Sequence, residues 1–231
     1  MGIQKFHNTQ TPRIGGLALV FGYFVAWVIQ SGEVREILGW VGVASFPVLA
    51  FGLAEDLSKS IGIATRLVAT LIAGIIFSQA TGYSVETVDL WQIDIFLAIP
   101  AFSIAFTAFA IGSSCNALNI IDGFHGLASG TMLLMLTMVA TISWTVGDIT
   151  LFQITTSIAA ITLGFFLVNF PSGKIFLGDG GAYFLGFLIA ALTVMLASRN
   201  PEVSPWICPL ILSYPLTELV VSIARKSWLK G

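Results

Sequence analysis

Five of the twelve acidic residues lie at ends of apolar stretches that are predicted to face the same side of a membrane, and the other seven lie on the opposite side. Glu55 and Asp56 form an adjacent pair in GLAEDLSKS, Asp122 lies in CNALNIIDGFHGLASG, Asp179 lies in PSGKIFLGDGGAYFLG, and Glu218 is the fifth. Carboxylates that converge from separate loops make the all-oxygen ligand set that Mg²⁺ prefers. The pattern therefore predicts a Mg²⁺ site built from the first four of these acids.

Glycine, amide and lysine side chains accompany the acids and suggest a phosphate-containing substrate. Glycines where helices begin let backbone N–H groups approach phosphate oxygens closely. Lysines and asparagines in the same segments add positive charge and further hydrogen-bond donors. Together they indicate phosphoryl transfer with a diphosphate substrate, and the residues concerned are Gly123, Gly126, Gly178, Gly180, Gly181, Lys59, Lys174, Asn116 and Asn119.

Each residue also has a simpler interpretation. A single acid at a helix end is usually a solvated, interfacial residue. Asn116 and Asn119 could be helix caps, and His125 a polar loop residue. Phe184 and Phe187 are expected to face lipid, and the two cysteines, Cys115 and Cys208, to fill the core. The functional hypothesis therefore depends on the co-occurrence of the residues.

The elements that must position these residues are predicted to be transmembrane helices. Hydrophobic residues make up 56% of the 231 residues and charged residues only 10%, with a mean hydropathy of +0.93, whereas a soluble domain carries about 25% charged residues. A bilayer core needs about 20 apolar residues per helix, and these stretches are too long and uniform for barrel strands. Eight apolar intervals, of which only the last holds a charge (Glu218), run over 14–32, 37–54, 67–85, 95–121, 123–147, 149–173, 180–198 and 203–224.

We therefore expect an all-α integral membrane protein, a polytopic bundle of about eight transmembrane helices with catalytic cytoplasmic loops. Short connections between the intervals favour antiparallel neighbours within one domain, residues 1–231. No N-terminal signal peptide is evident. The net charge of −2 indicates no nucleic-acid partner, and two cysteines without a CxxC pair form no disulfide framework.

The distribution of lysine and arginine predicts the orientation. With a cytoplasmic amino terminus, eight of the ten basic residues fall at inner ends, and only Arg35 and Arg199 lie outside. That excess matches the positive-inside rule. The five informative acids all fall on the same inner side, so the site is expected to face the cytoplasm.

Four ordered motifs make the chain similar to a known family. TPRIGG at 11–16, EDLSK at 55–59, NALNIIDGFHGL at 116–127 and FLGDGGAYFLG at 176–186 resemble the polyprenyl-phosphate N-acetylhexosamine-1-phosphate transferases. These are the UDP-GlcNAc:undecaprenyl-phosphate GlcNAc-1-phosphate transferase-like enzymes of glycosyltransferase family 4, and the resemblance runs from about Lys5 to Arg225. It implies transfer of a sugar 1-phosphate from a UDP-N-acetylhexosamine to undecaprenyl phosphate, with release of UMP.

The resemblance also implies roles for individual residues. Asp179 would be the principal Mg²⁺ ligand, with Mn²⁺ as an alternative ion and Asp56 as a second ligand. Glu55 and Asp56 would position or activate the polyprenyl phosphate. Asn119 and Asp122 would hold the nucleotide sugar, Phe176 would stack on uracil, and Gly178 would donate backbone contacts. The remaining substrate-binding residues implied are Lys5, His7, Arg13, Lys59, Asn116 and His125.

Two departures from the family pattern suggest a particular branch. Glu55 stands where the best-known members have Asp, and His125 where the family often shows Asp. Both are features of transferases that begin surface polysaccharides, such as O-antigen of lipopolysaccharide or capsule, in the bacterial inner membrane. A second copy of the chain is a partner that the sequence leaves open.

Two alternatives accompany this hypothesis. A membrane transporter would also carry intramembrane acids, but near the midplane on interrupted helices. The second alternative is a catalytically incomplete fragment. The loop motif begins at Lys5 and no histidine follows His125, whereas family members have one more helix before that loop and a histidine-rich loop after the last span. We therefore expect weak or no activity from these 231 residues alone.

Overall fold

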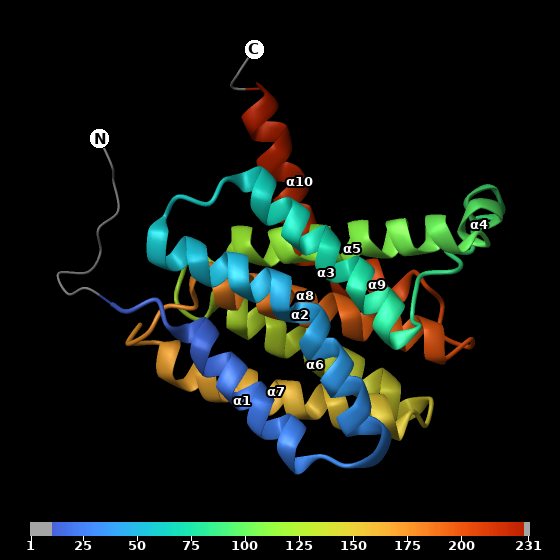
Figure 1. Ribbon diagram of the computed structural model, residues 1–231, viewed down its shortest axis with the longest axis horizontal. Coiled ribbons are helices and arrows are strands. Elements are labelled where there is room, and N and C mark those ends of the chain that lie inside the picture. The colour runs from blue at the N-terminus through green and yellow to red at the C-terminus, as the bar shows by residue number, and fades with distance from the viewer. Residues whose placement is uncertain (1–10, 229–231) are drawn as a thin grey trace.

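The computed structural model describes residues 11–228, and within that range the fold is a bundle of helices without strands (Figure 1). This confirms the predicted all-α polytopic fold. Six helices are long and apolar enough to cross a membrane: α2 (Gly32–Ser58), α3 (Ile63–Thr81), α5 (Pro100–Ile121), α6 (Leu127–Thr145), α7 (Ile149–Asn169) and α8 (Gly178–Arg199). The others are α1 (Gly15–Ile29), α4 (Trp91–Leu97), α9 (Ile207–Ile211) and α10 (Ser213–Trp228).

The predicted number of about eight spans is therefore wrong for the described residues, which contain six. The first apolar interval forms α1, a helix of 15 residues, whose length of about 22 Å is short of a 30 Å hydrocarbon core. The last interval is divided between α9 and α10, and its prolines interrupt the helical hydrogen bonding. In Figure 1, α10 extends beyond the other helices at a steep angle.

Helix α8 is the central element of the bundle. Its neighbours include α2, α5, α1 and α6, and 94% of its most apolar window is buried. Phe184 and Phe187 are 1% and 0% exposed, so the expectation that they face lipid is wrong. The lipid-facing surface is formed instead by outward side chains of other helices, such as Phe46, which is 69% exposed.

Helices α2 and α8 cross at a point where neither has room for a side chain. A Cβ atom added to Gly52 would lie 2.6 Å from the Cα atom of Gly180. Small residues allow helix backbones to approach closely, which is the main source of packing energy between helices in lipid. This crossing lies one turn before Asp56, so it sets the distance between Asp56 and the start of α8.

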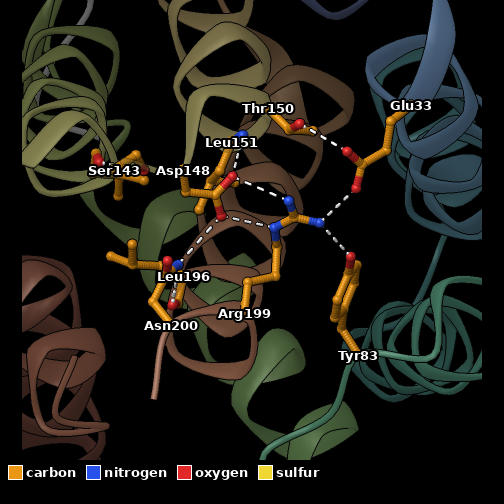
Figure 2. A network of polar contacts seen from close by, with 10 residues as sticks. Glu33, Tyr83, Ser143, Asp148, Thr150, Leu151, Leu196, Arg199 and Asn200 are labelled. Carbon is orange, nitrogen blue, oxygen red and sulfur yellow. Dashed lines mark hydrogen bonds and ion pairs between the residues drawn. The ribbon is translucent and has the colours of Figure 1, made fainter. Parts of the chain in front are cut away.

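The opposite end of α8 is held by a polar network around Arg199 (Figure 2). Its guanidinium donates to both carboxylate oxygens of Asp148, at 2.7 and 3.1 Å, to Glu33 at 2.9 Å and to the Tyr83 hydroxyl at 2.6 Å. These partners come from the start of α2, the start of α7 and the segment after α3. The network fixes four elements at the end of the bundle that the sequence assigned to the outside.

Asp148 is also the N-cap of α7 and accepts a hydrogen bond from the Leu151 N–H group. Its burial acts to raise its pKa, but the hydrogen bonds from Arg199 and the Leu151 N–H group outweigh burial, and the pKa is lowered. Asp148 is therefore a carboxylate at neutral pH. As such it compensates the Arg199 charge at this end of the bundle.

Candidate active site

Asp56 joins the end of α2 to the start of α8. Its two carboxylate oxygens accept hydrogen bonds from the backbone N–H groups of Asp179 and Gly180, each at 2.9 Å. The first N–H groups of a helix have no partner within the helix, and the helix dipole favours negative charge there. Asp56 therefore caps α8 from another helix and holds Asp179 beside the end of α2.

Gly178, the first residue of α8, is required by this arrangement. Its φ is +75°, a left-handed conformation that residues with a Cβ atom rarely adopt, and an added Cβ would lie 2.6 Å from an Asp56 oxygen. The backbone donors to Asp56 are the next two residues, so Gly178 provides the turn and the space.

Asp179 forms an ion pair with Arg66, on the first turns of α3. The two side chains are 21% and 16% exposed. The Arg66 guanidinium also lies 5.8 Å from the centre of the Tyr183 ring, one turn further along α8. Its Nε atom is buried and has no hydrogen-bond partner among the described residues.

Asp122 follows the last residue of α5 and belongs to the same electrostatic cluster. Its pKa is raised to about 7, first by burial and then by the negative charge of Asp179, with a further contribution from Asp56. Arg13, an exposed residue before α1, acts in the opposite direction. The structure thus brings together three of the four predicted catalytic carboxylates, from three different connections.

An aromatic pair lies beside these acids. The rings of His125 and Phe176 are stacked, with centres 5.2 Å apart and an angle of 18° between their planes. The backbone of Phe176 forms hydrogen bonds with the start of α1 and the segment before it. Its N–H group donates to the Pro12 carbonyl and its carbonyl accepts from the Gly15 N–H group, both at 3.0 Å. A flat half-buried surface next to the carboxylates is suited to a nucleobase.

Asn169 holds the two loops that carry this pair. Its side chain is buried, accepts a hydrogen bond from the Gly126 N–H group at 2.6 Å and donates to the Ile175 carbonyl at 2.7 Å. The sequence assigned no role to Asn169 or to Arg66. Two features of the sequence could have indicated these residues. Asn169 is an asparagine near the end of an apolar interval, and Arg66 is an arginine ten residues after Asp56.

Other predicted residues have more local contacts. Glu55 accepts a hydrogen bond from Ile61 N–H, within its own connection, at 2.7 Å. Lys59 is exposed and ends α2 in a left-handed conformation. The Asn116 amide donates to Gly112 in its own helix at 2.8 Å, and Asn119 lies one turn later, half-buried. Lys5 and His7 lie outside the described residues.

The residues present are suited to a hard divalent cation. Asp56, Asp122 and Asp179 supply oxygen ligands. In residues 11–228, no three carboxylate, histidine or cysteine side chains are grouped closely enough to enclose a metal. Mg²⁺ is usually bound by one or two carboxylates together with substrate phosphates, so the arrangement fits that ion.

Fold and site together define a class: a multi-pass membrane protein with an acidic cluster at one end of its helix bundle. The model of glycosyl transferase family 4 matches residues 38–197, which include Asp56, Asp122 and Asp179. The chain belongs to this family, as the four motifs predicted.

Curated relatives agree with the family. The probable undecaprenyl-phosphate N-acetylglucosaminyl 1-phosphate transferase of Bacillus subtilis is 30% identical over 96% of this chain and 62% of its own length. The decaprenyl-phosphate N-acetylglucosaminephosphotransferase of Mycobacterium tuberculosis is 27% identical with the same coverage. A phospho-N-acetylmuramoyl-pentapeptide-transferase of Streptococcus pneumoniae is 25% identical over 80% of this chain and 60% of that relative. The chain thus spans about three fifths of the length of these relatives.

Proposed function

We propose that this protein transfers N-acetylhexosamine 1-phosphate from a UDP-sugar to undecaprenyl phosphate and releases UMP. The observation that carries the proposal is the gathering of Asp56, Asp122 and Asp179 around the start of α8, in a family whose relatives are named for this transfer. Mg²⁺, or Mn²⁺ in its place, is the proposed cofactor. It would be held by Asp179, with Asp56 close by.

The reaction needs little covalent help from the protein. An oxygen of the acceptor phosphate attacks the phosphorus bonded to the sugar, the bond to the UMP oxygen breaks, and the electron pair leaves with UMP. The acceptor phosphate is mostly ionised at pH 7, because its second pKa is near 6. The main difficulty is repulsion between two anions, which bound Mg²⁺ would reduce by neutralising phosphate charge.

The chain's own residues then position the reactants. His125 and Phe176 would contact uracil, with Phe176 stacking on the base, while Asn119 and Asp122 would hold the sugar nucleotide. Asp56 keeps the first turn of α8 in place, and Glu55 would position the lipid phosphate from the connection after α2. Arg13 and Lys59 are exposed cations at this end of the bundle and would attract the anionic substrates.

We further propose that the site faces the cytoplasm in a bacterial inner membrane and that the product begins a surface polysaccharide such as O-antigen or capsule. Supply of UDP-sugars from the cytosol requires a cytoplasmic site. The excess of lysine and arginine at this end supports that orientation.

The reaction class can be tested with UDP-GlcNAc carrying ³²P at its β-phosphate. Membranes containing the chain, given undecaprenyl phosphate and Mg²⁺, should place the label in a lipid-extractable product and release unlabelled UMP. Transfer of the sugar alone would leave the label in UDP. Label recovered in UDP would contradict the proposal, and membranes containing Glu202→Gln, changed at an exposed acid after α8, should behave as the unaltered chain.

A further inference from the structure

Arg66 has an unusual position for a basic residue of a site that takes anions. Its guanidinium is bonded to Asp179, the carboxylate best placed to bind a metal ion, and both side chains are largely withdrawn from solvent. Asp56 makes no ion pair with Arg66, and its two oxygens accept backbone N–H groups of α8. Arg66 is therefore the counter-ion of Asp179.

Mg²⁺ and the Arg66 guanidinium compete for the Asp179 carboxylate, because both are cations and Arg66 already binds one of its oxygens. Mg²⁺ needs an Asp179 oxygen within about 2.1 Å, and a divalent ion beside a guanidinium experiences strong like-charge repulsion in a site of reduced dielectric constant. The Arg66 side chain is long, lies beside the Tyr183 ring and has an Nε atom with no partner among the described residues, so its Nε–H group is not held in place by a hydrogen bond.

We propose that Arg66 is the resident cation of Asp179 and that Mg²⁺ binding displaces it, so that the free guanidinium becomes a donor for a substrate phosphate. The inference rests on the proposed function, because it takes Asp179 to be a metal ligand. Arg66 keeps the carboxylate neutralised while the site is empty of metal. Its planar fork of N–H groups matches phosphate geometry once it is released.

Metal affinity provides the first test. Binding of Mn²⁺ alone to the purified chain is followed by loss of the free-ion signal in electron paramagnetic resonance. Arg66→Gln removes the competitor and should tighten Mn²⁺ binding about tenfold, within the range of typical coupling between linked sites. Arg35→Gln makes the same change of charge on the first turn of α2, at the other end of the bundle, and should leave the affinity unchanged.

Arginine reactivity provides the second test and separates displacement from a general charge effect. Phenylglyoxal modification of the unaltered chain, read by mass spectrometry of its peptides, should increase several-fold at Arg66 when Mg²⁺ is added. Arg35 in the same digest should not change. This measurement needs no variant, so it stands even if Arg66→Gln does not fold.

The outcomes distinguish this inference from the proposed function. Two results together would overturn the displacement of Arg66 by Mg²⁺: Arg66→Gln does not tighten Mn²⁺ binding, and Mg²⁺ does not raise the reactivity of Arg66. The metal site itself would remain intact. If neither the unaltered chain nor Arg66→Gln binds Mn²⁺, the metal is removed from the proposed function, and the displacement of Arg66 is overturned with it. Tighter binding in Arg66→Gln with raised Arg66 reactivity supports both.

Discussion

The carboxylates of the candidate site are distinguished by their partners. Asp56 accepts two backbone N–H groups and so stabilises the start of α8. Asp179 is paired with Arg66, and Asp122 lies near both acids with a pKa raised to about 7. Three residues of one chemical type are thus suited to a structural, a metal-binding and a substrate-binding role respectively.

The raised pKa of Asp122 predicts a pH-dependent cost to stability. An unfolded aspartate has a pKa of about 3.9, below the folded value of about 7. The contribution of Asp122 to the free energy of unfolding is therefore fully present below about pH 3.9 and is lost progressively as the pH rises through about 7. Asp122→Asn should therefore raise the melting temperature at pH 8 in metal-free detergent solution and change it little at pH 4. An increase of equal size at both pH values would contradict the charge explanation.

At the residue level, three of the four acids that the sequence singled out lie at one end of the bundle, but the sequence did not indicate what each one contacts. Apolar intervals of similar length placed Asp56, Asp122 and Asp179 at the same end of the bundle. The Asp179–Arg66 ion pair and the bonds of Asn169 depend on rotamers and helix rotation, which interval lengths do not contain. The stacking of Phe176 on His125 was likewise not predicted, and the stacking of Phe176 on uracil stays a prediction.

The contact between α2 and α8 relates helix packing to the geometry of the site. Gly52→Ala places a methyl group against the backbone of Gly180, and separating the helices would lengthen the Asp56 hydrogen bonds. Overpacking of this kind costs about 1–3 kcal/mol. We expect a lower melting temperature and reduced transfer activity. Gly164→Ala on α7, where an added Cβ meets nothing within 4 Å, is the matched control; equal effects of the two changes would contradict the role of the crossing.

The Arg199 network should stabilise the bundle from its other end. Arg199→Gln leaves Asp148 without its strongest partner, and loss of one member of a largely buried pair should cost about 2 kcal/mol, or roughly 4–8 °C in melting temperature. The pKa of Asp148 is lowered in the folded chain. Asp148 therefore stabilises the fold above the unfolded pKa of about 3.9, and this stabilisation is lost as the pH falls through the folded value. The difference from the unaltered chain should therefore shrink below about pH 4. Arg35→Gln serves as control, and a melting temperature unchanged at pH 7 would argue against the network.

At the level of elements, composition predicted a helical membrane bundle but overestimated its number of spans. Lengths of apolar intervals do not reveal that α1 is only 15 residues long, or that the last interval forms two helices. Uniformly apolar helices also look alike in sequence, so the central position of α8 could not be predicted. The glycines at 178, 180, 181 and 186 are the signal that was available, because a helix surrounded by others needs small residues at close crossings.

For the whole molecule, the two polar ends of the bundle should lie on opposite sides of the membrane. Lys174, before α8, and Glu202, after it, are both exposed. With Cys115 and Cys208 replaced, Glu202→Cys in intact cells should react with an impermeant thiol reagent, and Lys174→Cys should react only after the membrane is opened. The reverse pattern would contradict the proposed orientation and, with it, access of a cytosolic UDP-sugar to the site.

The central claim is that the carboxylates around the start of α8 perform metal-dependent transfer of a sugar 1-phosphate. The most direct test compares unaltered chain and Asp179→Asn in membranes supplied with labelled UDP-GlcNAc, undecaprenyl phosphate and either Mg²⁺ or a chelator. We predict slow formation of lipid-linked product that requires Mg²⁺, and less than about a tenth of that rate in Asp179→Asn, because loss of a metal ligand usually costs more than tenfold. Product formation that survives the substitution or the chelator would contradict the account.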